Sequence, residues 1–380
     1  MRVLILLILG VWPAVYLAPP AGAQGQNRDY FRVSTESRKY AVIFAGAGAD
    51  ETYQARFQQW ALKLYGLLAG DYGYPAEHLT LLAGRSDSAE PIISEPCRRD
   101  TISAALNELK KQVQPGDQIA FFFIGHGTSD NQNAKFVVAG PDITGADFAA
   151  SLNDFAGQDV IVVNSTSSGY PFCQTLSAPG RVVVCATRSA AERYDTIFAE
   201  SFLEGLENHA ADRDRNQRVS MFEAFVYTRE KVKKWYADRS RLPSEHPTID
   251  DNGDSRFAME PNPAEGEGSL AEIAYLDTIS ASLTEAVSGG PESEALRRLT
   301  AKSQDLERSV MLLRNQKSDM DEKLYWQQLE PLLIDLARTS RRLRSLQAAF
   351  EGAEDPSSLF ELRRGKQEAE AGRLDRDSRF

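Results

Sequence analysis

The chain has 380 residues, a formal net charge of −11 and 42% hydrophobic residues, a length that suits one large domain with an appendage. Its acidity argues against nucleic acid as a partner, because a phosphate backbone binds to a basic surface. Three cysteines, Cys97, Cys173 and Cys185, are too few and too irregularly spaced for a disulfide framework or a zinc site. One bridge is allowed, although Cys185 lies in the apolar run RVVVCAT and is expected to be buried.

The first 23 residues have the layout of a cleavable signal peptide. Arg2 precedes an apolar core that is too short to span a bilayer, and the small residues Ala21-Gly22-Ala23 provide a cleavage site. A membrane anchor is the alternative, but Pro13, Pro19 and Pro20 interrupt any long helix. We therefore expect residues 1–23 to be removed and the protein to be exported, to the periplasm or the extracellular space, without membrane contact after cleavage.

Residues 38–207 alternate apolar runs with amphipathic segments. The apolar runs predict strands over 40–48, 78–84, 118–127, 159–164 and 181–187. The segments between and after them predict helices over 52–70, 101–113, 143–155, where Thr144 opens the helix, and about 195–207. Near-continuous apolar strands separated by helices indicate an α/β fold, with a mostly parallel sheet covered by helices on both faces. Ligands of such sheets bind at the carboxyl ends of the strands.

The composition changes in the last third of the chain. A helix over 219–238 and a Pro- and Asp-rich segment close an α/β domain predicted over 24–258, and residues 259–269 form a linker. We expect residues 270–350 to be helical and residues 351–380, which are charged and broken by Gly and Pro, to be disordered.

A heptad pattern runs through the predicted helical region. Its positions, alternately four and three apart with two polar interruptions, are Leu299, Ser303, Leu306, Val310, Leu313, Lys317, Met320 and Leu324. Pro331 suits the first turn of a further helix, along which Leu333, Leu336, Leu343 and Phe350 continue the stripe. This pattern predicts an antiparallel hairpin packed on its own core, or a coiled-coil contact with a second copy or another protein.

Two predicted strand ends carry candidate chemistry. The first is Gly125-His126-Gly127, where glycines leave the His exposed and suited to act as a general base, unless it is ordinary polar surface. The other histidines, His78, His209 and His246, lie among polar residues and are expected at the surface. The second strand end is NSTSSG (164–169), a run of hydroxyl side chains. Neighbouring parallel strands end at one edge of a sheet, which would bring His126 near Thr166.

The first motif is an apolar strand followed by GHG, and the second is a later apolar strand followed by xxxxSG. Together they resemble the cysteine peptidases of the legumain and caspase clan, and they resemble the legumains more than the caspases. Four further stretches resemble that family in the same order, so that the resemblance covers about residues 38–208. They are AGAGADETYQARFQQW (45–60), GYPAEHLTLL (73–82), GPDITGADFAASL (140–152) and ATRSAAERYDTIFAESFLEGL (186–206). The resemblance implies a caspase-like fold and a peptide or protein ligand.

In this family a His assists a Cys that lies in an Ala-Cys-x-Ser-Gly turn. His126 matches the His, Ser168 and Gly169 match the Ser-Gly, and Ser165 stands at the Ala position. The Cys position is Thr166, whose hydroxyl is less acidic and less nucleophilic than a thiol. The resemblance therefore implies a degenerate peptidase. The alternatives are an active hydrolase that uses Thr166 with His126 as base, and a non-catalytic module for peptide binding or assembly.

The substrate pocket of the family also differs. Legumains carry an Arg and a Glu at the positions that match Gln54 and Asn164, so the resemblance does not extend to asparagine specificity. Backbone amides of Gly127 and Thr166 are candidates for an oxyanion pocket that binds a carbonyl with or without cleavage.

A separate stretch, DRDRNQRVSMFE (212–223), follows the spacing of an EF-hand calcium loop between two predicted helices. Its ligand positions are Asp212, Asp214, Asn216, Arg218 through its carbonyl, Ser220 and Glu223. Gln217 replaces the usual Gly of the sharp turn, and the alternative is a polar connection in which Ser220 caps the next helix. The segment DDNGD (250–254) is a weaker candidate for a second calcium contact. No cofactor is otherwise expected.

Overall fold

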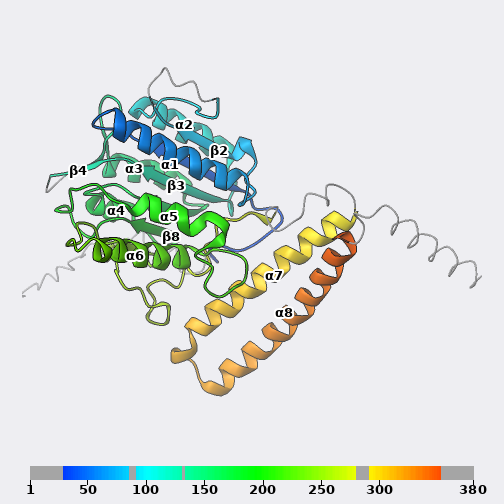
Figure 1. The fold of residues 1–380 in the computed structure, drawn as a ribbon. Helices are drawn as coiled ribbons and strands as arrows, with labels where there is room; N and C mark the ends of the chain where they lie inside the picture. The colour runs from blue at the N-terminus through cyan, green and yellow to red at the C-terminus, as the bar shows by residue number, and fades with distance from the viewer. Residues whose placement is uncertain (1–28, 85–90, 131–132, 280–290, 352–380) are drawn as a thin grey trace, which may run out of the picture.

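The computed structural model describes residues 29–84, 91–130, 133–279 and 291–351. The predicted signal peptide and residues 352–380 of the predicted disordered tail lie outside the described residues. The main sheet has the strand order β2-β1-β3-β7-β8-β9, and Figure 1 labels β2, β3 and β8 within it. Its first five strands are parallel and β9 is antiparallel to β8. The predicted α/β class with a mostly parallel sheet is therefore confirmed.

The strands and helices of this body follow the predicted order with small shifts at their ends. The strands of the main sheet are β1 (Lys39–Ala45), β2 (Leu79–Leu82), β3 (Gln118–Ile124), β7 (Asp159–Asn164), β8 (Arg181–Cys185) and β9 (Thr248–Asp250). The helices are α1 (Glu51–Ala69), α2 (Arg99–Gln112), α3 (Gly145–Leu152), α4 (Tyr170–Leu176), α5 (Phe198–Leu206) and α6 (Met221–Asp238). Short 3-10 helices cover Ala76–His78, Asn153–Phe155, Glu207–His209, Pro263–Glu265 and Lys317–Asp319.

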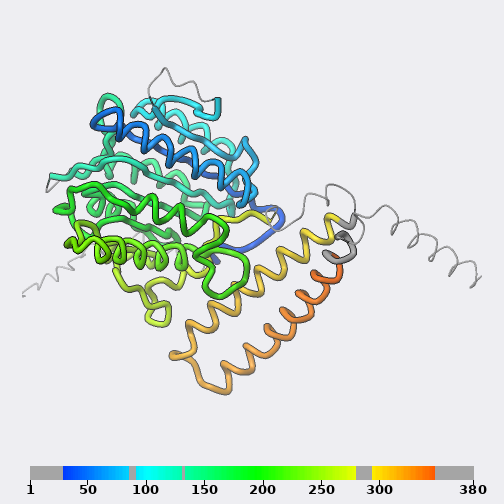
Figure 2. The backbone as a smooth tube through the Cα atoms, viewed as in Figure 1, coloured from blue at the N-terminus to red at the C-terminus, as the bar shows by residue number. Residues whose placement is uncertain are grey.

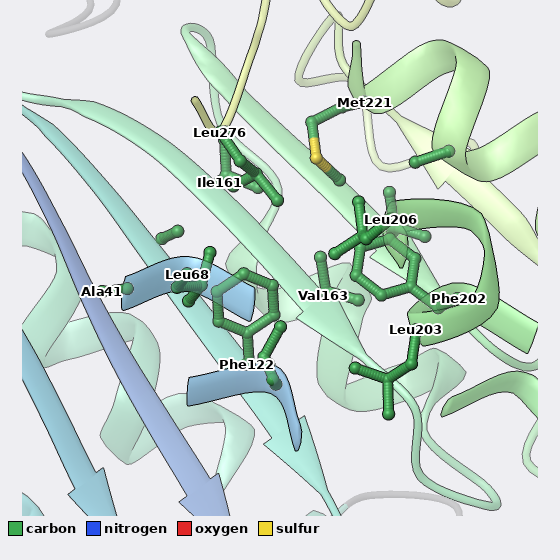
Figure 3. Packing of buried hydrophobic residues seen from close by; sticks show 14 of the residues in the cluster. Ala41, Leu68, Phe122, Ile161, Val163, Phe202, Leu203, Leu206, Met221 and Leu276 are labelled. Atoms are coloured by element: carbon green, nitrogen blue, oxygen red, sulfur yellow. The ribbon is translucent and has the colours of Figure 1, made fainter. Parts of the chain in front are cut away.

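Helices cover both faces of the main sheet. Side chains alternate along β1, so that Ala41 and Ile43 face the layer of α1, α5 and α6, whereas Val42 and Phe44 face the layer of α2, α3 and α4. Figure 3 shows the first layer, where Leu68, Phe122, Val163 and Phe202 meet. Each fully buried side chain of this size contributes about 1.5–3 kcal/mol, and the two layers fix the strand ends that carry the candidate site.

Three short parts of the fold were not predicted: a small second sheet, one helix and one edge strand. A second, antiparallel sheet of β4 (Gly127–Ser129), β5 (Ala134–Phe136) and β6 (Ile143–Thr144) follows β3, so the segment predicted as one helix from residue 143 begins as a strand. Thr144 nevertheless caps α3 as expected, because its hydroxyl oxygen accepts the N–H of Asp147. The others are α4 and the edge strand β9. All three are too short to show a clear periodicity.

The C-terminal helices α7 (Pro291–Asn315) and α8 (Glu322–Glu351) form an antiparallel hairpin, which projects from the α/β body (Figures 1 and 2). Leu313, Tyr325 and Leu329 form its small core near the turn. The prediction of one continuous heptad seam from Leu299 to Leu324 was wrong, because the chain turns between α7 and α8. The prediction that Pro331 begins a helix was also wrong, because Pro331 lies inside α8. Its position is exposed, so water can hydrogen-bond to the backbone carbonyl that has no N–H partner there.

Residues 270–278 are not helical, in contrast to the prediction. Ala271, Ile273, Ala274 and Leu276 are buried against the first core layer, and the regular helix α7 begins at Pro291. The predicted contact with a second copy or another protein stays a prediction. Four apolar side chains of α8 remain 43 to 51% exposed, namely Leu324, Trp326, Leu333 and Ile334. Among the described residues, no helix is both long and apolar enough to cross a membrane.

Candidate active site at the carboxyl edge of the sheet

The turn after β7 is tied to its surroundings by hydrogen bonds along its length. The Asn164 Oδ1 accepts the N–H of Thr166 at 2.9 Å, and the Ser165 hydroxyl donates to the carbonyl of Phe123 at 2.7 Å. Ser168 has a φ of 50° and donates its N–H and hydroxyl to the carbonyls of Glu192 and Ala190. The hydroxyl cluster is therefore a rigid, buried turn and not an exposed loop.

Thr166 lies between two glycines, one from each motif. A Cβ atom built on Gly127 or on Gly169 would stand 2.8 Å from the Thr166 Oγ1, and one on Gly127 would also stand 2.3 Å from the carbonyl oxygen of Ser167. The GHG loop and the turn after β7 thus meet directly, as the parallel topology predicted. Thr166 is only 2% exposed. Its N–H, predicted as an oxyanion donor, is already bound by Asn164.

His126 lies in an aromatic and acidic environment. The rings of Tyr53 and Phe57 from α1 pack against its ring in T-shaped arrangements, with centroids 5.0 and 4.9 Å away. The Nδ1 atom lies 3.7 Å from Oδ1 of Asp195. Burial lowers the pKa of His126 below its usual value, although Asp195 opposes this effect. The ring is therefore largely neutral at neutral pH, which is the state in which a general base accepts a proton.

Asp195 and Arg56 complete this group, and sequence reasoning missed both. Asp195 lies in the loop between β8 and α5, and its Oδ2 accepts a hydrogen bond from Arg56 Nη2 at 3.2 Å. A hydrogen bond to Asp195 also raises the pKa of Tyr53. The guanidinium of Arg56 stacks over the rings of Tyr53 and Trp60. The topology could have pointed to Asp195. Because β8 is parallel to β7, the loop that follows β8 begins at the same edge of the sheet as the two motifs.

A small cavity of about 10 Å³ lies beside the His126 ring, enough for about one water molecule. It is lined by Arg56, Phe57, Trp60, Gly125, His126, Ser165, Ser167, Asp195 and Thr196. The two serines that flank Thr166 contribute to this lining, whereas Thr166 itself packs against the glycines. The Nε2 of His126 is buried and has no hydrogen-bond partner among the described residues.

The two predicted pocket residues are both held by the protein itself. Asn164 is 1% exposed and its side chain shapes the turn. Gln54, on α1, accepts the N–H of Gly48 through Oε1 at 2.9 Å, and its Nε2 is buried without a partner in the described part of the chain. Their role in substrate selection stays a prediction.

No cysteine replaces the missing nucleophile. Cys97, Cys173 and Cys185 are free and fully buried, so the disulfide that the sequence allowed is not formed. Burial raises the pKa of the Cys97 and Cys173 thiols, which keeps them protonated.

The expectation that His246 lies at the surface was wrong. It is partly buried, and its Nδ1 lies 2.5 Å from Oε1 of Glu192, in the loop that also binds Ser168. His78 packs against the ring of Tyr40 and is likewise half-buried. His209 packs against the ring of Tyr72.

The predicted calcium loop has its acidic side chains together. Carboxylate oxygens of Asp212, Asp214 and Glu223 lie within 4.8 Å of one another, and burial with the neighbouring carboxylates raises the pKa of Asp214. Gln217, at the position of the usual Gly, has a φ of 66°, the conformation that the turn needs. Ser220 caps α6, and Arg218 forms a buried ion pair with Asp277. Calcium binding stays a prediction.

Comparison with known proteins does not assign the chain to a family. No protein-family model matches it, and no curated protein is similar to it.

Proposed function

We propose that this protein is an exported, degenerate relative of the legumain and caspase peptidases, which binds a peptide or protein ligand without thiol-dependent cleavage. The strand order and the meeting of the GHG loop with the Ser-Gly turn support a caspase-like domain. The motifs occupy the ends of β3 and β7, two adjacent parallel strands, where ligands of such sheets bind.

The burial of Thr166 is the main observation that supports a loss of peptidase activity. A nucleophile must reach a carbonyl carbon, yet the Thr166 side chain is 2% exposed and packs against Gly127 and Gly169. A β-branched side chain also has few rotamers through which to reorient. The cavity beside His126 is too small to admit a peptide.

A panel of fluorogenic peptides tests this proposal with the wild type, His126→Ala and Thr166→Ala. We expect the three proteins to give the same background rate. Turnover by the wild type that both substitutions abolish would contradict a degenerate site and establish an active hydrolase.

A second candidate function, a serine hydrolase, is favoured by one specific observation. Ser167, His126 and Asp195 line the same cavity, which brings a hydroxyl, an imidazole and a carboxylate together. The Ser167 hydroxyl donates only a long hydrogen bond, 3.5 Å, to the carbonyl of Gly127. Ser167→Ala therefore belongs in the panel: a serine hydrolase loses turnover in Ser167→Ala and keeps it in Thr166→Ala.

A further inference from the structure

A larger cavity, of about 170 Å³, lies at the opposite edge of the sheet from the candidate active site. Its floor contains Lys39, Gln118 and Asp159, which begin β1, β3 and β7. Its walls come from residues 31–38, residues 273–279 and α7. The cavity thus lies where the α/β body, its last extended segment and the C-terminal hairpin meet.

The charged lining of this cavity is mainly basic, although the chain as a whole is acidic. Five cationic side chains line it, namely Arg32, Arg38, Lys39, Arg218 and Arg297, against two carboxylates, Asp159 and Asp277. Such a concentration of one sign in a concave site attracts ligands of the opposite sign.

Both carboxylates are already bound by the protein. Arg218 donates two hydrogen bonds to Asp277, at 2.7 and 3.0 Å, and stacks on the ring of Tyr275. Asp159 accepts the N–H of Phe31 at 2.8 Å. Both carboxylates also attract the Lys39 ammonium, but no ion pair joins them to Arg38 or Arg297 among the described residues.

Arg32 pairs with Asp305, whereas Arg38, Lys39 and Arg297 form no ion pair within 4.0 Å among the described residues. Lys39 donates to the backbone carbonyl of Tyr275 at 2.6 Å, and its burial lowers its pKa to about 8. Arg38 and Arg297 make no side-chain hydrogen bond or ion pair in the described part of the chain. Burying the Lys39 ammonium costs free energy, and a bound anion beside it would offset this cost.

We propose that this cavity binds a small ligand through an oxyanion group held by Arg38, Lys39 and Arg297. Guanidinium groups bind phosphate and carboxylate oxygens in a bidentate way, and the ammonium adds a point charge. The cavity is smaller than one for a drug-sized molecule, so the ligand is a small anion such as a phosphate or a short carboxylic acid. Because Arg297 belongs to α7 and the other two to the α/β body, the ligand connects the two parts. This site is independent of the proposed peptide-binding function.

Thermal melting of the full chain with inorganic phosphate or with citrate, at constant ionic strength with sodium chloride as reference, tests the proposal. We expect a saturable rise in the melting temperature with at least one of the two anions. Arg297→Gln should weaken the apparent affinity at least tenfold. Arg298→Gln is the matched control, because Arg298 is adjacent on α7 but is exposed and paired with Glu294.

Arg38→Gln provides a second variant that disturbs folding little, because Arg38 is exposed. It should also weaken binding. The proposal is overturned if neither anion raises the melting temperature beyond the chloride reference. It is equally overturned if Arg297→Gln and Arg298→Gln respond alike.

Discussion

Gly127 joins the two loops of the candidate site because it has no side chain. A Cβ atom there would stand 2.3 Å from the Ser167 carbonyl oxygen and 2.8 Å from the Thr166 hydroxyl, so the turn would have to move. We expect Gly127→Ala to lower the free energy of unfolding by about 1–3 kcal/mol, the usual cost of overpacking. Chemical denaturation measures this difference.

Gly66→Ala is the control for that substitution. Gly66 lies within α1, and a Cβ there meets nothing within 4 Å. Alanine should stabilise the helix by up to about 1 kcal/mol. Equal effects of the two substitutions would show that the close approach at Gly127 has no energetic consequence.

At the level of residues, the sequence predicted the contact between loops and not the partners of His126. The GHG and NSTSSG motifs end adjacent parallel strands, so their meeting follows from topology. Asp195 and Arg56 are distant in sequence and carry no motif, and they reach His126 only through the packing of α1 and of the loop after β8. Side-chain contacts of this kind depend on three-dimensional packing, which periodicity does not encode.

At the level of elements, long regular segments were predictable and short ones were not. The five parallel strands are continuous apolar runs, and α1, α2 and α6 are long enough to show their helical period. The strands β4, β5 and β6, of two or three residues each, exist because each pairs with another. Pro331 shows the reverse case, in which a local signal for a helix start is overridden by the continuing helix α8.

The loop between α5 and α6 carries a prediction at this same scale. Calcium should raise the melting temperature of the wild type, because it neutralises three carboxylates held within 4.8 Å. At ten times the dissociation constant, binding adds about 1.4 kcal/mol of stability. Glu223→Gln, which keeps a capping side chain for α6, should abolish most of this shift.

Asp238→Asn is the control for the calcium experiment, because Asp238 is exposed at the end of α6 and pairs with Lys234, away from the loop. It should leave the shift unchanged. No difference between melts with calcium and with excess chelator would rule out a stabilising site.

At the level of the whole molecule, two edges of one sheet carry different chemistry. The carboxyl edge holds His126, Asp195 and the hydroxyl turn, whereas the amino edge holds a basic cavity closed by α7. The hairpin is attached beside the second edge: Arg308 of α7 donates to the carbonyl of Tyr30, and Asn315 donates to Glu272. A ligand at the amino edge would therefore act on the placement of the hairpin without touching the candidate active site.

The pH dependence of stability in this acidic molecule is set partly by Glu245, which holds the start of α5. Its side chain is 1% exposed, and Oε1 accepts the N–H of Ile197 and the hydroxyl of Tyr236. Burial raises the pKa of Glu245 from 4.5 to about 7, so the folded protein keeps a proton that the unfolded chain releases. The contribution of this proton to the free energy of unfolding is complete below pH 4.5 and is lost as the pH rises to about 7.

Glu245→Gln should remove this part of the pH dependence, because glutamine resembles the protonated acid and retains an oxygen acceptor. We expect wild type and variant to have similar free energies of unfolding at pH 5, and the variant to be more stable at pH 8 by up to about 3 kcal/mol. Glu204→Gln is the control: Lys231 lowers the pKa of Glu204, so this substitution should make the protein less stable at pH 8. If urea titrations at the two pH values give parallel changes for the wild type and Glu245→Gln, Glu245 is already ionised in the folded protein and its burial does not set the profile.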